Sequence, residues 1–164
     1  RQRARALVRF DELLDRIALS ECAMVPACCS LEIDWACMPP SCDPCASSPR
    51  MNGTPRGRRK RESIAAFAGL LGRSMNALEA DAPSRAPTIV DAGCGTGALI
   101  LPLAALFPTA IFVGVDYKAG SIARLEARAK AAGEDVSARV LAWQGRIEEY
   151  EGPCDAVVSL HACG

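Results

Sequence analysis

Three glycines, Gly93, Gly95 and Gly97, alternate with other residues in the segment VDAGCGTGALI, directly after a short apolar run. Glycine lets the backbone turn tightly and lie against a ligand, because no Cβ stands in the way. The apolar residues that follow are typical of a helix, whose first N–H groups would face the same ligand. A glycine loop between a strand and a helix therefore predicts a site for a nucleotide-like cofactor.

An acidic residue ends the next apolar run. Asp116 lies 23 residues beyond Gly93, near the end of AIFVGVDY. A carboxylate at the end of a neighbouring strand can accept hydrogen bonds from ribose hydroxyl groups. A glycine loop alone is a weak signal, but the order strand, loop, helix, strand and carboxylate makes cofactor binding a specific hypothesis.

The loop leaves two cofactors open. Gly93, Gly95 and Ala98 satisfy the dinucleotide fingerprint, so the spacing does not exclude NAD. Asp91 precedes the loop, where its charge would repel a pyrophosphate but could meet the ammonium group of S-adenosylmethionine, directly or through water. The alternative is that Asp91 only ties down the loop. The pattern D-x-G-x-G-x-G is similar to the first motif of Rossmann-like methyltransferases, which use S-adenosylmethionine.

Alternating strands and helices must position these residues. Such an alternation predicts right-handed βαβ units and a parallel sheet, with Gly133 as the C-terminal cap of the second helix. Strands are expected at 88–93, 110–117, 138–144 and 155–160, and helices at 98–107 and 121–133.

The chain divides into three parts. Residues 1–20 contain an amphipathic helical pattern, and 21–61 form an irregular linker rich in cysteine and proline that ends in a basic run. Residues 62–164 form the cofactor-binding half of the domain and open with a helix over about 62–80. This organisation predicts one α/β domain with an N-terminal helix and a linker.

Composition sets further limits. The formal net charge is zero and no apolar run reaches the roughly 18–20 residues of a membrane helix, so we expect no membrane partner. Six of the nine cysteines fall between Cys22 and Cys45, without the histidines or paired spacings of a zinc module. We interpret them as reduced thiols and expect no metal. The expected compartment is the cytoplasm, with the nucleus as the alternative.

The basic run RGRRKRE carries five positive charges in six positions. It is either a solvated surface, a nuclear signal, the lining of an anionic cofactor site or a contact for RNA. The residues that would contact RNA are Arg56, Arg58, Arg59, Lys60 and Arg61.

Four segments resemble the methyltransferase domain of glutathione S-transferase C-terminal domain-containing proteins. They are IDW with the prolines after it, RRKRE, VDAGCGTG and VVSLHACG, within about residues 31–164. The resemblance implies a Rossmann-like fold of strand order 3-2-1-4-5-7-6 and S-adenosylmethionine as cofactor, and it leaves the methyl acceptor open. A more distant likeness to tRNA-methylating proteins makes RNA a candidate acceptor.

The sequence stops after the fourth strand of that order. We therefore expect a truncated fold that is poorly stable alone, because an unpaired strand is exposed, and inactive by itself.

The expected site combines cofactor contacts with one candidate catalytic residue. His161, the only histidine, either acts as a base or orients the acceptor, or else is a strand-tip residue bonded to the loop. Arg146 occupies the place where many methyltransferases have an acceptor for the adenine amino group, which arginine cannot supply, so Gln144 or a backbone carbonyl is expected there. The expected cofactor contacts are Asp91, Gly93, Cys94, Gly95, Gly97, Asp116, Tyr117, Gln144, Ile147 and Leu160.

The leading hypothesis for function is an S-adenosylmethionine-dependent methyltransferase. Two alternatives stay open, a non-catalytic binding module with a vestigial cofactor pocket and an NAD-type oxidoreductase.

Overall fold

Short runs of β-branched and aromatic residues form the four strands of a parallel sheet, which has the order β3-β2-β1-β4. The computed structural model describes residues 30–46, 50–81 and 85–160. The sheet confirms the predicted Rossmann-like α/β class and the expected order of the first four strands. The strands are β1 (Thr88–Ala92), β2 (Ile111–Asp116), β3 (Val140–Gln144) and β4 (Ala156–Val158).

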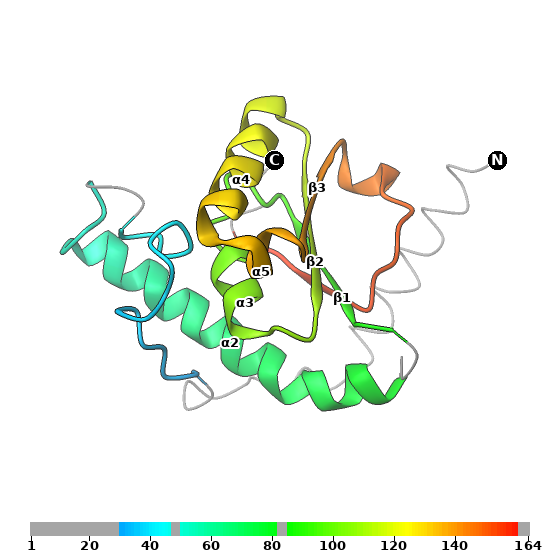
Figure 1. Ribbon diagram of the computed structural model, residues 1–164, viewed down its shortest axis with the longest axis horizontal. Helices are drawn as coiled ribbons and strands as arrows, with labels where there is room; N and C mark the ends of the chain where they lie inside the picture. The colour runs from blue at the N-terminus through cyan, green and yellow to red at the C-terminus, as the bar shows by residue number, and fades with distance from the viewer. Residues whose placement is uncertain (1–29, 47–49, 82–84, 161–164) are drawn as a thin grey trace.

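Helices connect the strands and gather on one side of the sheet (Figure 1). Helix α3 (Ile100–Leu106) joins β1 to β2, and α4 (Ala119–Ala132) with α5 (Glu134–Ser137) joins β2 to β3. A 3-10 turn, η2 (Ile147–Glu149), follows β3. Gly133 ends α4 with a φ of 111°, which confirms the predicted cap.

The long helix α2 (Pro55–Asp81) begins seven residues before the predicted start at residue 62. A local cap explains the difference, because the Thr54 side chain accepts a hydrogen bond from the Gly57 N–H at 3.1 Å. Pro55 occupies the first helical position, where a missing N–H costs nothing. The basic run therefore belongs to the first two turns of α2 and not to a linker.

The segment before α2 has no helix or strand over residues 30–46, but it is packed into the protein rather than acting as a loose linker. Met38 and Cys42 are buried in the main core, and the buried Asp43 pairs with Arg61 of α2. The Arg61 guanidinium also lies 5.0 Å from the centre of the Trp35 ring. These contacts dock the segment on α2.

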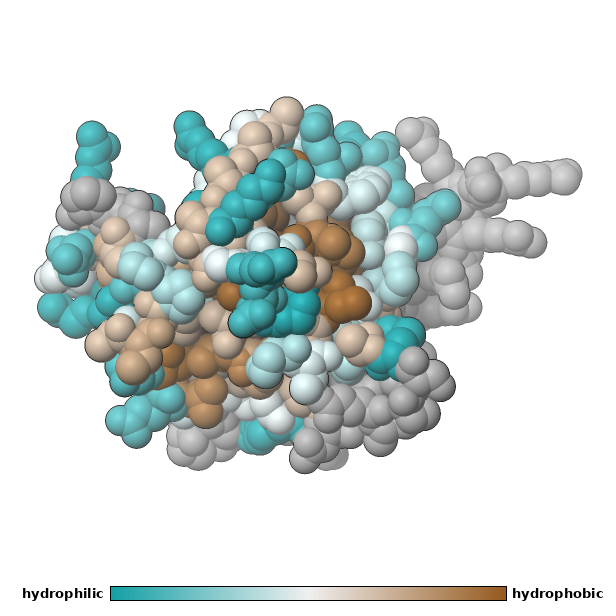
Figure 2. Space-filling model, in the orientation of Figure 1, coloured by the Kyte–Doolittle hydropathy of each residue, from teal (hydrophilic) through white to brown (hydrophobic). Residues whose placement is uncertain are grey.

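The two faces of the sheet are unequal. Ile89 and Phe112 belong to the main core, which includes the buried side chains of α2, α3 and α4. The other face carries a small cluster of Val90, Val113 and Val115. The residues paired with this cluster on the outer strands are exposed, Leu141 of β3 to 52% and Val157 of β4 to 59%. Figure 2 shows hydrophobic surface in the middle of the viewed face, bordered by hydrophilic side chains.

Several expectations lie outside the described residues, namely the N-terminal helix in 1–20 and the cysteines at 22, 28, 29 and 163. Among the described residues, no helix combines the length and the apolar character needed to cross a membrane.

The guanidinium of Arg139 closes the C-terminal end of α3. It donates hydrogen bonds to the carbonyls of Phe107 (3.0 Å), Ala110 (3.3 Å) and Ala104 (2.9 Å). These carbonyls lie at and just beyond the C-terminal end of α3, where a helix has no N–H groups of its own to pair with them. A positive charge at this end interacts favourably with the helix dipole. Arg139 thereby fixes the turn between α3 and β2.

We expect Arg139→Met to lower the free energy of unfolding by about 1–3 kcal/mol, because carbonyls at the end of α3 lose a charged donor. Urea denaturation measures the change. Lys130→Met, which removes an exposed charge from α4, is the matched control and should cost less than about 0.5 kcal/mol. Equal losses in the two variants would contradict the capping role.

Candidate cofactor site

The glycine loop after β1 is held against the end of β2. The N–H groups of Gly93 and Cys94 both donate to the Val115 carbonyl, at 2.9 and 3.0 Å. Gly93, Gly95 and Gly97 have φ values of 74°, 55° and 81°, a region that other residues rarely adopt. The predicted loop is therefore present, and its backbone requires the glycines.

Gly95 and Gly97 serve different purposes. A Cβ on Gly97 would lie 2.5 Å from Cδ1 of Leu125, so this glycine lets α4 pack closely. A Cβ on Gly95 would meet nothing within 4 Å, so it would stand in open space above the loop. That open space is where a ligand can approach the backbone.

Asp116 ends β2, as predicted, and its carboxylate faces the loop. Oδ2 accepts a hydrogen bond from the Gly95 N–H at 2.9 Å, and Oδ1 accepts one from the Lys118 N–H at 2.8 Å. Two backbone donors therefore fix the orientation of the carboxylate. Each oxygen keeps a further lone pair, which can accept a hydroxyl group of a ligand.

Asp91 is the most unusual group of the site. Its side chain is 1% exposed, and its Oδ2 atom has no hydrogen-bond partner among the described residues. Burial raises the pKa of this carboxyl from 3.8 to about 7, against the opposing effect of the Ile100 N–H at the start of α3. The nearby charge of Asp116 raises the pKa further, and Lys60 lowers it. An unsatisfied buried carboxylate of this kind favours a cationic partner.

Other predicted contacts lie at the same edge of the sheet. Tyr117 is 66% exposed, with the Lys118 ammonium 5.2 Å from its ring centre. Gln144 pairs in register with Asp116, so the ends of β2 and β3 lie together. Ile147 is 46% exposed in η2, whereas Leu160 is partly buried against the main core.

Cys94 does not present its side chain to this edge. The Cys94 side chain is buried, and burial raises the pKa of its thiol to about 12, so only its backbone is available to a ligand. His161 lies outside the described residues. Arg146 is 70% exposed and pairs with Glu148 at 2.6 Å.

Two contacts at the site had not been predicted. The Ser159 hydroxyl donates to the Ala92 carbonyl at 2.9 Å and ties the segment after β4 to the end of β1. The half-buried Arg128 of α4 donates to the carbonyls of Thr96 (2.7 Å) and Ser41 (2.7 Å). An arginine in a helix has no local pattern that reveals such partners.

The cysteines of the described segments are free thiols, with Cys42 and Cys45 buried. Burial raises the pKa of the Cys42 thiol. Within residues 30–46, 50–81 and 85–160, no three Cys, His, Asp or Glu side chains are grouped so that they could hold a metal ion.

The raised pKa of Asp91 predicts a pH-dependent effect of Asp91→Asn on stability. The pKa of Asp91 is higher in the folded state than in the unfolded state. Its contribution to the free energy of unfolding is therefore fully present below about pH 4 and is lost as the pH rises through about 7. Asparagine carries no charge at either pH. We therefore expect the free energy of unfolding of Asp91→Asn, relative to that of wild type, to be about 2 kcal/mol higher at pH 8 than at pH 5, as measured by urea denaturation.

Glu126→Gln is the matched control, since it removes a carboxylate from the exposed face of α4. A change of stability for Asp91→Asn that is the same at both pH values would show that Asp91 is not held in a desolvated environment.

The comparisons with known proteins agree with this geometry. The family described as "Methyltransferase domain" matches residues 89–164, which run from β1 to the end of the chain. No curated protein sequence matches the chain.

Solved structures are similar over part of their length. The magnesium protoporphyrin IX methyltransferase of Synechocystis PCC 6803, with bound S-adenosylmethionine, is 20% identical over 69% of this chain and 53% of its own, with a TM-score of 0.45. An RNA methyltransferase from Salinibacter ruber is 21% identical over 53% of this chain and 56% of its own, with a TM-score of 0.39. The glycopeptide N-methyltransferase MtfA is 17% identical, covering 52% of this chain and 40% of its own, with a TM-score of 0.40.

The chain thus spans about half the length of these structures. Their TM-scores lie below 0.5, so the fold assignment depends on the strand order of this chain. Residues 89–164 are thus similar to this methyltransferase-domain family, and their strand order β3-β2-β1-β4 is that of a Rossmann-like fold.

Proposed function

We propose that the chain binds S-adenosylmethionine at the carboxyl ends of β1 and β2 and supplies the cofactor half of a methyltransferase. The observation that carries this proposal is the buried Asp91 carboxylate before the glycine loop, one oxygen of which has no partner in the part of the chain that the structure describes. In this arrangement the cofactor's ammonium group approaches Asp91, and Asp116 accepts its ribose hydroxyls. An NAD pyrophosphate would instead meet two carboxylates, which disfavours the oxidoreductase alternative.

The remaining contacts follow from this placement. Tyr117 and Ile147 offer exposed apolar surface to the adenine ring, and Gln144 can accept its amino group. Positioning then accounts for much of catalysis, because methyl transfer requires in-line approach of the acceptor to the sulfonium. His161 keeps its proposed role as a base or as a group that orients the acceptor.

We also propose the narrower relationship to glutathione S-transferase C-terminal domain-containing proteins. It is supported by the sequence VVSLHACG, whose first two residues end β4, and by the IDW segment docked on α2.

Calorimetric titration with S-adenosylhomocysteine, S-adenosylmethionine and NAD tests the cofactor. We expect both S-adenosyl compounds to bind and NAD not to bind. Asp116→Ala should weaken S-adenosylhomocysteine binding about tenfold to a hundredfold, since a charged acceptor of the ribose is lost. Asp116→Asn, which keeps an acceptor for the Gly95 N–H, separates loss of loop structure from loss of the ribose contact.

Each other outcome rejects a part of the proposal. Binding of NAD alone would favour an oxidoreductase, and the absence of all binding would favour a non-catalytic module. Unchanged affinity in Asp116→Ala would overturn the placement of the ribose.

We further propose RNA as the methyl acceptor, on the evidence of the basic run at the start of α2. Arg58 and Arg59 are exposed on the first two turns of the helix, available to a phosphate backbone. Arg61 is not equally available, because it pairs with Asp43 and lies over Trp35. Within the basic run, Arg61 therefore serves the fold, whereas Arg58 and Arg59 are exposed to solvent.

The salt dependence of tRNA binding tests this acceptor. Each phosphate contact contributes close to one unit to the slope of log K against log salt concentration. We expect a steep slope for wild type and a shallower one for Arg58→Gln/Arg59→Gln, with Arg61 left in place to preserve the fold. A flat response in wild type would remove RNA as the acceptor.

A further inference from the structure

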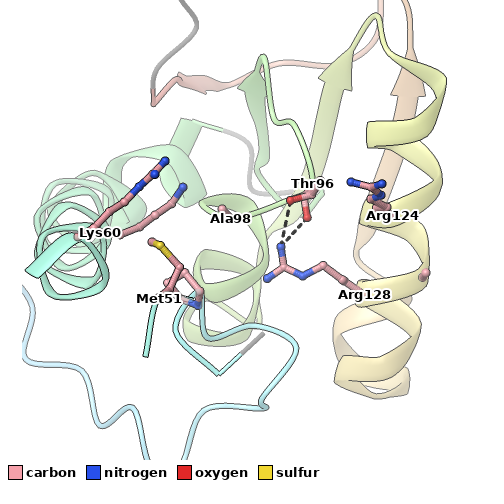
Figure 3. Close-up of a pocket in the computed structure, with 9 residues that line it drawn as sticks. Met51, Lys60, Thr96, Ala98, Arg124 and Arg128 are labelled. Carbon is pink, nitrogen blue, oxygen red and sulfur yellow. Dashed lines mark hydrogen bonds between the residues drawn. The ribbon is translucent and has the colours of Figure 1, made fainter. Parts of the chain in front are cut away.

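A cavity of about 440 Å³ opens between the start of α2, the glycine loop and α4. Figure 3 shows Lys60 entering from α2 and Arg124 and Arg128 from α4, on either side of Thr96 and Ala98 of the loop. Arg56 of α2 also lines the cavity. The cavity therefore touches the same loop as the cofactor site, and four positive side chains surround it.

None of the described residues that line the cavity is acidic, so no side chain of the lining balances these charges. Burial lowers the pKa of Lys60, and the nearby charges of Arg56 and Arg128 lower it further. Like charges held this close repel each other, and partial burial strengthens the repulsion. The arrangement stores unfavourable electrostatic energy that an anion would relieve.

The four side chains are not equally committed to the fold. Arg128 already donates to the Ser41 and Thr96 carbonyls, so these hydrogen bonds fix the position of its positive charge in the lining. Arg56 and Arg124 are exposed at the rim, and Lys60 is half-buried inside. A ligand can thus use the ammonium of Lys60 and the exposed guanidinium groups of Arg56 and Arg124 without breaking the contacts of Arg128.

We propose that this cavity binds a phosphate group of the RNA acceptor, next to the cofactor loop. This inference rests on the proposed function, and it adds a defined site to the general contact of the basic run. Arginine forks and a lysine ammonium are the groups that bind phosphate oxygens most strongly. A phosphate held here would anchor the acceptor against the loop that also contacts the cofactor.

The carboxylate of the cofactor is the other anion within reach, because Lys60 also interacts with the charge of Asp91. A cofactor carboxylate and a single backbone phosphate each carry one negative charge, so neither of them alone balances the four cations. The nucleic-acid backbone offers several phosphates to the same surface. The charge of the cavity therefore favours the acceptor, and the experiment must separate the two ligands.

The test compares Lys60→Gln and Arg124→Gln with Lys130→Gln, which removes an exposed charge from α4 outside the cavity. Binding of tRNA and of S-adenosylhomocysteine is measured for each variant and for wild type. We expect the two cavity variants to weaken tRNA binding about tenfold each and to lower the salt slope by about one unit. S-adenosylhomocysteine affinity should stay within about twofold for Arg124→Gln, and inorganic phosphate should compete with tRNA in wild type only.

Two results would overturn the inference. If Lys60→Gln and Arg124→Gln weaken S-adenosylhomocysteine binding and leave tRNA binding intact, the cavity serves the cofactor carboxylate. If all three variants weaken tRNA equally, the attraction is diffuse and no phosphate site exists. Failure of wild type to bind S-adenosylhomocysteine is a separate result, which rejects the proposed function and not the phosphate site.

Discussion

The guanidinium of Arg128 holds together three parts of the protein that are distant in the sequence. From α4 it reaches the Ser41 carbonyl in the segment before α2 and the Thr96 carbonyl in the glycine loop. On the strand side the loop is held by the Val115 carbonyl and the Asp116 carboxylate, and Arg128 adds a tie from the helix side. Because its three donor nitrogens are all used, Arg128 contributes its charge to the cavity while its position is fixed by the fold.

The glycine loop separates groups of opposite charge. Asp91 and Asp116 lie on the strand side, where one carboxylate is buried and the other is oriented by two backbone N–H groups. Arg128 and Lys60 lie on the helix side, with the remaining cations of the cavity. The two sides interact electrostatically, because the charge of Asp91 raises the pKa of Lys60 and the charge of Lys60 lowers the pKa of Asp91. A change of charge on one side of the loop is therefore felt on the other.

The sequence was sufficient for features that are local. Strand positions, the glycine loop and Asp116 follow from apolar runs and from the backbone freedom of glycine, and all lie where they were expected. The start of α2 was missed although a local signal existed, since Thr54 and Pro55 form a typical helix cap. The burial of Asp91, the packing of residues 30–46 and the partners of Arg128 could not be predicted. They depend on tertiary contacts between segments far apart in the sequence, on which spacing carries no information.

This division of charge bears on which ligands can share the site. A cofactor with an ammonium group satisfies Asp91 and leaves the cavity to another anion, whereas a pyrophosphate would face carboxylates on one side and could reach the cations only across the loop. In the proposed arrangement, a methyl acceptor anchored by a phosphate approaches from the helix side, where Thr96 and Ala98 line the cavity. None of the residues assigned to the cofactor in that arrangement lines the cavity, so acceptor and cofactor can be held at once, as direct methyl transfer requires.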